Sequence, residues 1–302
     1  MTTKYAIEGN NITKKLKGFN LDIDDLKVPK GFATALIGEN GAGKTTLLNI
    51  LSGLRLDYRG DITFFGRYSD KEKEDNGNVK NRIGYTGTGK YYLPQWTVRD
   101  IENISKILFE DFSEDRFRKY CDELAIFPHG QLDMKKPNSS FSDGMKVKLM
   151  LAGVLSRDTD MLILDEPASP LDPLMRDKLC QLISEYINNG NGEKSVFFST
   201  HNISDMENIT DYAIIMENGQ IVEQGFVEDL KEKYIVIKGD AADTQKAKDI
   251  LYTITTNPYG FEGICLSENL DKLAGLNVTK EIPTLYQISV AVMKNNTKIV
   301  MR

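Results

Sequence analysis

The chain has little of what membrane-spanning, secreted or metal-binding proteins need. Its 302 residues include three widely spaced cysteines and two histidines, too few for a disulfide framework or a multi-histidine metal site. The longest apolar runs, such as 161–164, are far shorter than the roughly 20 residues that a bilayer requires. The chain opens on mixed polar residues instead of a secretory signal. The sequence therefore indicates a soluble cytosolic protein.

An excess of positive charge is also missing. Lys and Arg total 38 and Asp and Glu total 44, which gives a formal net charge of −6. A protein that is held to nucleic acid mainly by counterion release needs a basic surface, so this balance argues against a nucleic-acid partner. The apolar share of 40% is ordinary for a globular protein, and the length allows one large domain or two ordinary ones.

One local pattern is far more specific than the composition. Residues 38–45 satisfy G-x-x-x-x-G-K-[ST] and stand between a strand-like apolar run at 32–37 and a helix-like run at 46–51. In this arrangement backbone N–H groups and a helix N-terminus face a polyphosphate. We expect Lys44 to reach the β- and γ-phosphates and the Thr45 hydroxyl to bind Mg²⁺. The residues expected at the nucleotide are Gly38, Asn40, Gly41, Ala42, Gly43, Lys44, Thr45 and Thr46.

A second apolar run, 161–164, ends at Asp165 and Glu166. Such a run predicts a buried parallel strand, and sheets of this type bind ligands at the carboxyl ends of their strands. Asp165 is placed to hold Mg²⁺, and Glu166 can point at an attacking water. Alone, such a carboxylate pair is often only the start of a solvated loop. The phosphate loop in the same chain favours the functional interpretation, with a cation between the carboxylates and the phosphates.

Three further segments, added to these motifs, resemble the nucleotide-binding subunit of ATP-binding cassette (ABC) transporters over about residues 1–233. Phe141-Ser142-Asp143-Gly144-Met145 is similar to the family signature Leu-Ser-Gly-Gly-Gln, 169–172 is similar to the D-loop, and His201 is similar to the switch histidine. The resemblance implies an α/β P-loop domain with a mixed sheet core, an antiparallel β subdomain, and a helical signature subdomain at about 97–157.

The resemblance also implies a site that two copies share. Two nucleotide-binding domains sandwich two MgATP, and Ser142 and Gly144 of one meet the γ-phosphate bound to Lys44 of the other. Asp172 is implied to connect the two sites. As a good N-cap, Ser142 also predicts the start of a helix. Asp143 brings a negative charge near the phosphate, which is unfavourable unless its side chain points away. The implied catalytic residues are Glu166, His201 and Lys44.

Two positions depart from the family pattern. The glutamine that the family carries shortly after Tyr85 falls on Thr88, whose shorter hydroxyl is the candidate for the metal or its water. The aromatic residue that stacks on adenine aligns most simply with Leu16, and Phe19 is the nearby aromatic ring. Either residue can cover adenine, and Phe19 can equally be ordinary core. We therefore expect weak base selectivity, with GTP binding in addition to ATP.

The remaining segments predict the surroundings of these motifs. Residues 1–30 have the pattern of antiparallel strands, 69–81 that of a solvated surface loop, and 97–136 that of helices. Asn218-Gly219 predicts a hairpin between two apolar runs. Residues 234–302 predict a small C-terminal α/β accessory domain without a motif. A packing or dimer-stabilising appendage is favoured there over a ligand-binding regulator.

These features favour an ATPase subunit at the cytoplasmic face of the cell membrane that powers a separate membrane transporter. The signature and residues 283–287 resemble ABC-2-type exporter ATPases, including the bacitracin-type, YtrB-like and phenol-soluble-modulin exporter group, which implies export of a peptide, toxin or antimicrobial. The implied partners are a second copy or homologous nucleotide-binding subunit and integral membrane permease subunits on separate chains. The alternative is a soluble ABC ATPase of translation or DNA maintenance. Such proteins usually have two cassettes in one chain or a long coiled coil, and the sequence shows neither of these, nor a basic stripe for RNA or DNA.

Overall fold

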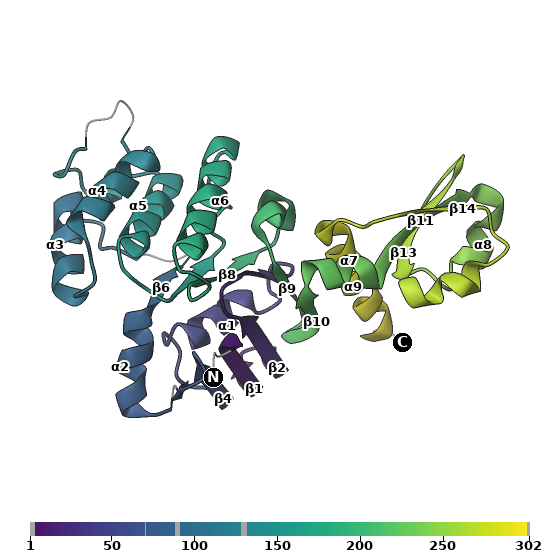
Figure 1. The fold of residues 1–302 in the computed structure, drawn as a ribbon, viewed down its shortest axis with the longest axis horizontal. Helices are drawn as coiled ribbons and strands as arrows, with labels where there is room; N and C mark the ends of the chain where they lie inside the picture. The colour runs from purple at the N-terminus through teal and green to yellow at the C-terminus, as the bar shows by residue number, and fades with distance from the viewer. Residues whose placement is uncertain (1–3, 70, 88–90, 128–131, 301–302) are drawn as a thin grey trace.

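The computed structural model describes residues 4–69, 71–87, 91–127 and 132–300, which form three sheets (Figure 1). The first is antiparallel, in the order β2 (Phe19–Pro29), β1 (Tyr5–Leu16), β4 (Arg59–Phe64) and β5 (Tyr68–Ser69). The second has the order β10 (Gln220–Phe226), β9 (Tyr212–Glu217), β3 (Ala33–Ile37), β8 (Ser195–Thr200), β7 (Met161–Asp165) and β6 (Ile83–Thr86). The third, also antiparallel, has the order β12 (Thr253–Asn257), β13 (Gly260–Leu266), β11 (Tyr234–Asp240) and β14 (Val278–Glu281).

The central sheet confirms the predicted mixed α/β core. Strands β9, β3, β8, β7 and β6 run parallel, and β10 returns antiparallel to β9 through a turn in which Asn218 and Gly219 have φ of 48° and 85°. Such angles are those of the hairpin turn that Asn-Gly favours. Every residue of β3, β7 and β8 is buried, which explains their continuous apolar sequences.

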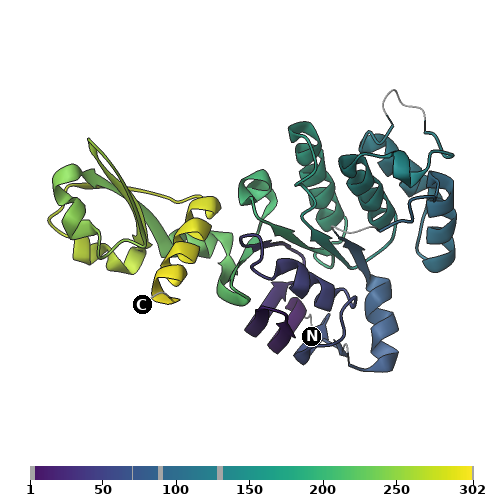
Figure 2. The ribbon, with the colours of Figure 1, turned by 180° about the vertical axis from the view of Figure 1, so that it is seen from behind.

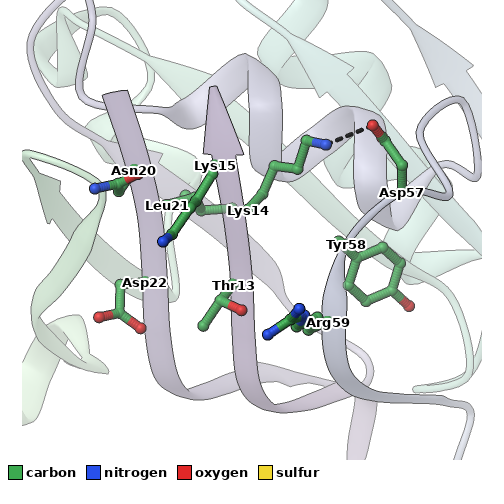
Figure 3. Close-up of a pocket in the computed structure, with 9 residues that line it drawn as sticks. All are labelled: Thr13, Lys14, Lys15, Asn20, Leu21, Asp22, Asp57, Tyr58 and Arg59. Carbon is green, nitrogen blue, oxygen red and sulfur yellow. Dashed lines mark hydrogen bonds and ion pairs between the residues drawn. The ribbon is translucent and has the colours of Figure 1, made fainter. Parts of the chain in front are cut away.

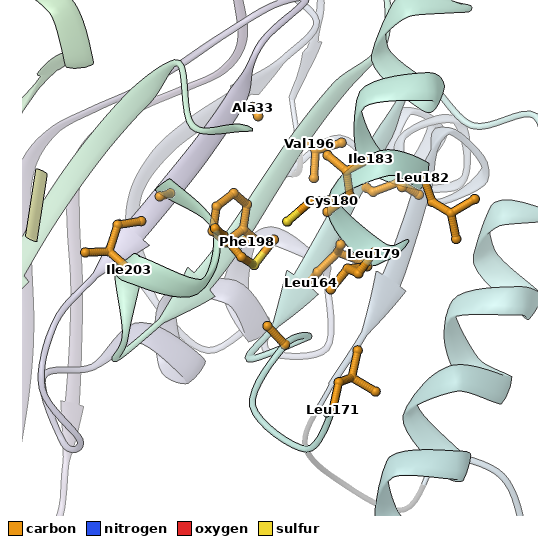
Figure 4. Packing of buried hydrophobic residues seen from close by; sticks show 14 of the residues in the cluster. Ala33, Leu164, Leu171, Leu179, Cys180, Leu182, Ile183, Val196, Phe198 and Ile203 are labelled. Carbon is orange, nitrogen blue, oxygen red and sulfur yellow. The ribbon is translucent and has the colours of Figure 1, made fainter. Parts of the chain in front are cut away.

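Helices cover both faces of the central sheet. Helix α6 (Pro173–Asn188) packs on the face that carries Leu164 and Phe198 (Figure 4). Helix α1 (Lys44–Leu51) packs on the opposite face, which carries Ile163 and Phe197. Each fully buried side chain of this size contributes about 1.5–3 kcal/mol. The two layers fix the carboxyl ends of β3, β7 and β8, where the candidate residues lie.

The prediction of a solvated loop at 69–81 is wrong, because helix α2 (Lys73–Arg82) occupies most of it. Val79, which is 5% exposed, packs in the same cluster as Ile50 and Leu51 of α1. Lys80 and Arg82 lie in the last turn, where positive charge suits the helix dipole. A single buried apolar residue, Val79, produces no helical periodicity, so the sequence pattern was that of a loop.

The helical subdomain contains α3 (Val98–Leu108), α4 (Glu114–Glu123) and α5 (Asp143–Leu155), as the helical spacing predicts. Helix α3 begins at a capping box formed by Thr97 and Asp100. Ile101 is buried, but Ile107 and Leu108 are 81% and 63% exposed. The apolar stripe of α3 is therefore only partly covered by the rest of the chain.

The segment after residue 233 is divided between two environments. The third sheet, with helix α8 (Thr244–Ala247), encloses a small core of its own. Helix α9 (Leu285–Val300) instead lies between that sheet and the central domain, beside α7 (Val227–Lys233) (Figure 2). Leu285 and Ile288 are fully buried in the cluster that contains Ile203 and Met206. Within the described ranges, no helix has the length and apolar character needed to span a bilayer.

Candidate nucleotide-binding site

The glycine loop between β3 and α1 has the backbone that a phosphate cradle needs. Gly41 and Gly43 have φ of 90° and 106°, a region that side chains disfavour, and a Cβ on Gly38 would lie 2.4 Å from the carbonyl oxygen of Met216. Gly43 is the N-cap of α1 and has no side chain that could cap the helix. The first backbone N–H groups of α1 are therefore available to another acceptor. These groups are positioned to bind an anion.

Lys44 is held inside this loop. Its side chain is 6% exposed, and its Nζ donates to the carbonyl oxygens of Gly38 at 2.7 Å and Glu39 at 3.2 Å. The same Nζ lies 3.5 Å from Oε1 of Glu166. A buried ammonium that is held mainly by neutral carbonyls can serve as a ready counter-charge for phosphate.

Asp165 ends β7 beside the start of α1. Its Oδ2 accepts a 2.9 Å hydrogen bond from the Thr45 hydroxyl, and its Oδ1 accepts one of 2.5 Å from Ser199. Carboxylate and hydroxyl oxygens are the donors that Mg²⁺ prefers, and Mg²⁺ also keeps water and phosphate ligands. In the described part of the chain, no cluster of three or more His, Cys, Asp or Glu residues could hold a metal alone. This pair of side chains therefore fits Mg²⁺ that arrives with a nucleotide.

Glu166 links the other predicted catalytic residues. Its Oε2 lies 2.8 Å from Nδ1 of His201, and its backbone N–H donates to Ser199 at 2.9 Å. Glu166 has φ of 51°, an unfavourable value for a residue with a side chain. Strained residues of this kind cluster at functional sites, where the surrounding structure holds them. The structure thus brings Lys44 and His201 together around the Glu166 carboxylate, and Ser199 connects the Glu166 backbone to Asp165.

The two candidates for the adenine contact lie side by side. Leu16 and Phe19 pair across the β1–β2 hairpin. The Phe19 ring packs on the phosphate loop, since a Cβ on Gly43 would lie 2.7 Å from its Cζ. Phe19 also packs, partly buried, against the core cluster that includes residues of α1. Thr88, the candidate at the glutamine position, lies outside the described residues.

The signature and D-loop residues lie at the starts of other helices. Ser142 is the N-cap of α5, as predicted, and its hydroxyl accepts from Met145 N–H at 3.3 Å. Asp143 is exposed and its carboxylate pairs with Lys146 at 3.0 Å, which offsets its charge. Asp172 caps α6 in the same way and is exposed. A Cβ on Gly144 would lie 2.8 Å from the carbonyl oxygen of Pro170, so the two segments touch.

Sequence reasoning missed residues that hold this site in place. Ser199 is fully buried and bridges Asp165 and the backbone of Glu166. Its place near the carboxyl end of the buried strand β8, two residues before His201, was the available signal. Tyr85 donates to Asn49 of α1 at 3.0 Å. Burial, followed by the charge of Asp165, raises the pKa of the Tyr85 hydroxyl far above its ordinary value, so this donor stays protonated.

A groove of about 550 Å³ lies on the antiparallel sheet (Figure 3). Lys14 crosses toward Asp57 and pairs with it, and this contact lowers the pKa of the Asp57 carboxyl. The charged side chains that line the groove include both basic and acidic residues. Its lining residues are Thr13, Lys14, Lys15, Asn20, Leu21, Asp22, Asp57, Tyr58 and Arg59.

Comparison with known proteins places this geometry in context. Residues 21–169 match the profile of the ABC transporter family. The energy-coupling factor transporter ATP-binding protein EcfA2 of Methanospirillum hungatei JF-1 is 29% identical, and the alignment covers 68% of the chain and 50% of EcfA2. The bacitracin transport ATP-binding protein BcrA of Enterococcus faecalis is also 29% identical, over 83% of the chain and 79% of BcrA. The chain therefore spans only half the length of the first relative.

Solved structures share the fold. An ATP-binding subunit of an ABC transporter superposes with a TM-score of 0.63 at 23% identity, over 75% of the chain and 92% of that structure. The dimeric ATP-binding cassette MJ0796, in a post-hydrolysis state with ADP and Pi, superposes with a TM-score of 0.61 at 19% identity, over 73% and 98%. At these identities the likeness concerns the fold alone.

Proposed function

Since this chain contains an ATP-binding domain of the ABC transporter family, we propose that it is the ATP-hydrolysing subunit of a membrane transporter. In this proposal two such domains close over two MgATP and drive a separate membrane subunit. The observation that carries it is the contact network of Lys44, Thr45, Asp165, Glu166 and His201 at one end of the central sheet.

The proposed chemistry divides phosphoryl transfer among these side chains. Lys44 and the N-terminus of α1 stabilise charge on the phosphates, and Thr45 and Asp165 would hold Mg²⁺, whose charge supplies further stabilisation. Glu166 accepts a proton from the attacking water, and His201 orients this carboxylate through the 2.8 Å contact. The strained backbone of Glu166 keeps the carboxylate between Lys44 and His201.

The exposed helix starts support a shared site. Ser142 and Asp172 lie on the surface and cap α5 and α6. The Lys44 ammonium instead contacts Gly38, Glu39 and Glu166. We therefore propose that they complete the site of a second copy or a homologous subunit. Dimeric MJ0796 supports this arrangement by analogy of fold.

A groove on the helical subdomain supports a membrane partner. It measures about 220 Å³ and is lined mainly by apolar and aromatic side chains, among them Tyr91, Trp96, Ile104 and Leu108. Leu108 is 63% exposed, and its neighbour Ile107 is 81% exposed. Adjacent exposed apolar side chains mark interaction sites. We propose that a cytoplasmic segment of the membrane subunit docks here and holds the chain at the cytoplasmic face.

Export of a peptide or antimicrobial is the finer part of the proposal. It is supported by the likeness to BcrA and by the sequence of residues 283–287. We also propose the division into 1–233 and 234–302, with α9 as the part of the second segment that binds to the first.

Affinity purification from detergent-solubilised membranes tests the transporter proposal. We expect a multi-span membrane protein to co-purify, and we expect Leu108→Asp to abolish its capture. Tyr259→Asp is the matched control, because Tyr259 is 91% exposed and lies in the third sheet's hairpin, away from the groove. Capture of ribosomes or DNA instead would favour the soluble alternative. The ATPase proposal is tested separately by phosphate release from MgATP, which Lys44→Ala should abolish.

A further inference from the structure

A chain of polar contacts joins the segment after His201 to the loop before Asp172. The Asn202 side-chain amide donates to Oδ2 of Asp205 at 3.0 Å. The Arg176 guanidinium donates to Oδ1 of the same carboxylate at 2.7 Å, and its Nε donates to the Leu171 carbonyl oxygen at 2.9 Å. One planar guanidinium therefore connects two loops that lie about thirty residues apart in sequence.

The two ends of this network meet the proposed catalytic residues. Asn202 directly follows His201, which contacts Glu166. Leu171 directly precedes Asp172, the N-cap of α6, so the Arg176 side chain holds the loop immediately before Asp172. Behind the network, Leu171, Cys180 and Ile203 belong to one buried cluster (Figure 4). The two loops are thus fixed to each other by polar contacts at the surface and by packing beneath.

Stability alone gives a weak reason for this arrangement. The side chains of Arg176 and Asp205 are 30% and 20% exposed, and ion pairs that reach solvent contribute little to the free energy of unfolding. A lysine could pair with Asp205, but the longer, planar fork of an arginine presents separate N–H groups to the carboxylate and to the Leu171 carbonyl in a fixed geometry. The residue type therefore matches the geometry of a connection between loops.

We propose that Arg176 and Asp205 are positioning residues that make the His201 segment and the Asp172 loop move as one unit. This inference rests on the proposed function, in which Asp172 reaches the second nucleotide site of a dimer. A shift at His201 when the γ-phosphate leaves would then displace Asp172, and through it the other site. The network is the physical connection that makes the two hydrolysis events cooperative.

The test is the ATP dependence of hydrolysis by the full-length chain. We expect a Hill coefficient near about 2 for wild type and about 1 for Arg176→Gln and Asp205→Asn. We expect kcat to fall roughly 10- to 100-fold, because small displacements of catalytic groups are costly, while nucleotide affinity stays unchanged. The double variant should be no worse than either single one, because both remove the same connection. Arg176→Lys should also lose cooperativity, since it keeps the charge but loses the bond to Leu171.

Lys178→Gln is the matched control. Lys178 lies on the same helix and pairs with Glu123 of α4 at 2.8 Å, with 26% and 24% exposure. We expect it to change the melting temperature as Arg176→Gln does and to leave the Hill coefficient as in wild type. The inference is overturned if Arg176→Gln and Asp205→Asn keep wild-type cooperativity, or if wild type hydrolyses ATP without cooperativity. A wild-type chain that binds or hydrolyses no ATP would instead overturn the proposed function itself.

Discussion

Three helix N-termini carry the proposed nucleotide contacts, and they differ in what occupies their N–H groups. Helix α1 begins after Gly43 and has no side-chain cap. Helices α5 and α6 are capped by Ser142 and Asp172, whose side chains accept from their own third N–H groups. The N-terminus of α1 is thus open to an external anion, whereas the starts of α5 and α6 are satisfied by their own side chains.

Burial separates the same two regions. Lys44 and Asp165 are 6% and 4% exposed and contact each other's neighbours, whereas Ser142 and Asp172 are exposed. One chain therefore contains a nearly complete phosphate side and an isolated signature side. Because the two regions differ in burial, we expect that mutations can abolish nucleotide hydrolysis while nucleotide binding is retained.

The strongest test of this separation is Glu166→Gln. We expect hydrolysis to fall roughly 10²- to 10⁴-fold, the usual contribution of a general base, with ATP binding and ATP-dependent dimerisation retained. Phosphate release and light scattering after size-exclusion chromatography measure the two effects. Glu193→Gln, at the opposite end of β8, is the control and should behave as wild type. Wild-type turnover by Glu166→Gln would mean that another group activates the water.

Ser142→Ala tests the signature side. We expect ATP binding by the monomer to persist, while ATP-dependent dimerisation and hydrolysis decrease at least about tenfold, because one hydrogen bond to a charged phosphate is lost. Ser113→Ala is the matched control, since Ser113 caps α4 with the same 3.3 Å bond. Both variants should lose about 1 kcal/mol of stability. Equal loss of hydrolysis in both would show that only helix capping matters.

Ile288→Ala asks whether the phosphate side is independent of helix α9. Ile288 is fully buried, so we expect the free energy of unfolding to fall by about 2–5 kcal/mol. Below the unfolding transition, the ATP dissociation constant should be unchanged, because α9 packs mainly against α7, β9, β10 and the third sheet. Urea unfolding and nucleotide titration measure the two quantities. A weaker affinity in the folded variant would contradict the independence of the phosphate side.

The smallest expected effect concerns alkaline pH. Burial raises the pKa of Tyr212, at the start of β9, to about 12, above the value of about 10 in an unfolded chain. The native state then holds the proton that the unfolded state has lost, so the free energy of unfolding falls as pH rises from about 10 to 12. Tyr212→Phe should reduce this fall in urea titrations, and Tyr259→Phe, at an exposed site, should leave it unchanged.

Motifs made of neighbouring residues could be predicted from the sequence, whereas contacts between residues far apart in the sequence could not. The glycine loop and the Asp165 strand follow from neighbouring residues, because phosphate contacts impose an order on the chain. Helix α2 was missed because Val79 is its one buried anchor among the described side chains. The link from Arg176 to Asp205 was invisible because it joins residues from separate elements, and only the packing of α6 beside β8 brings them together.

Helix α9 has a consequence for synthesis on the ribosome. Leu285 and Ile288 complete the cluster that contains Ile203 and Met206, so the surface behind the switch histidine remains open until translation has passed residue 288. Domains that emerge first usually fold first. Here the nascent chain carries an uncovered apolar patch for about eighty further codons. The apolar cover on this side of the central sheet is therefore completed late in synthesis, by a helix that lies outside the nucleotide site.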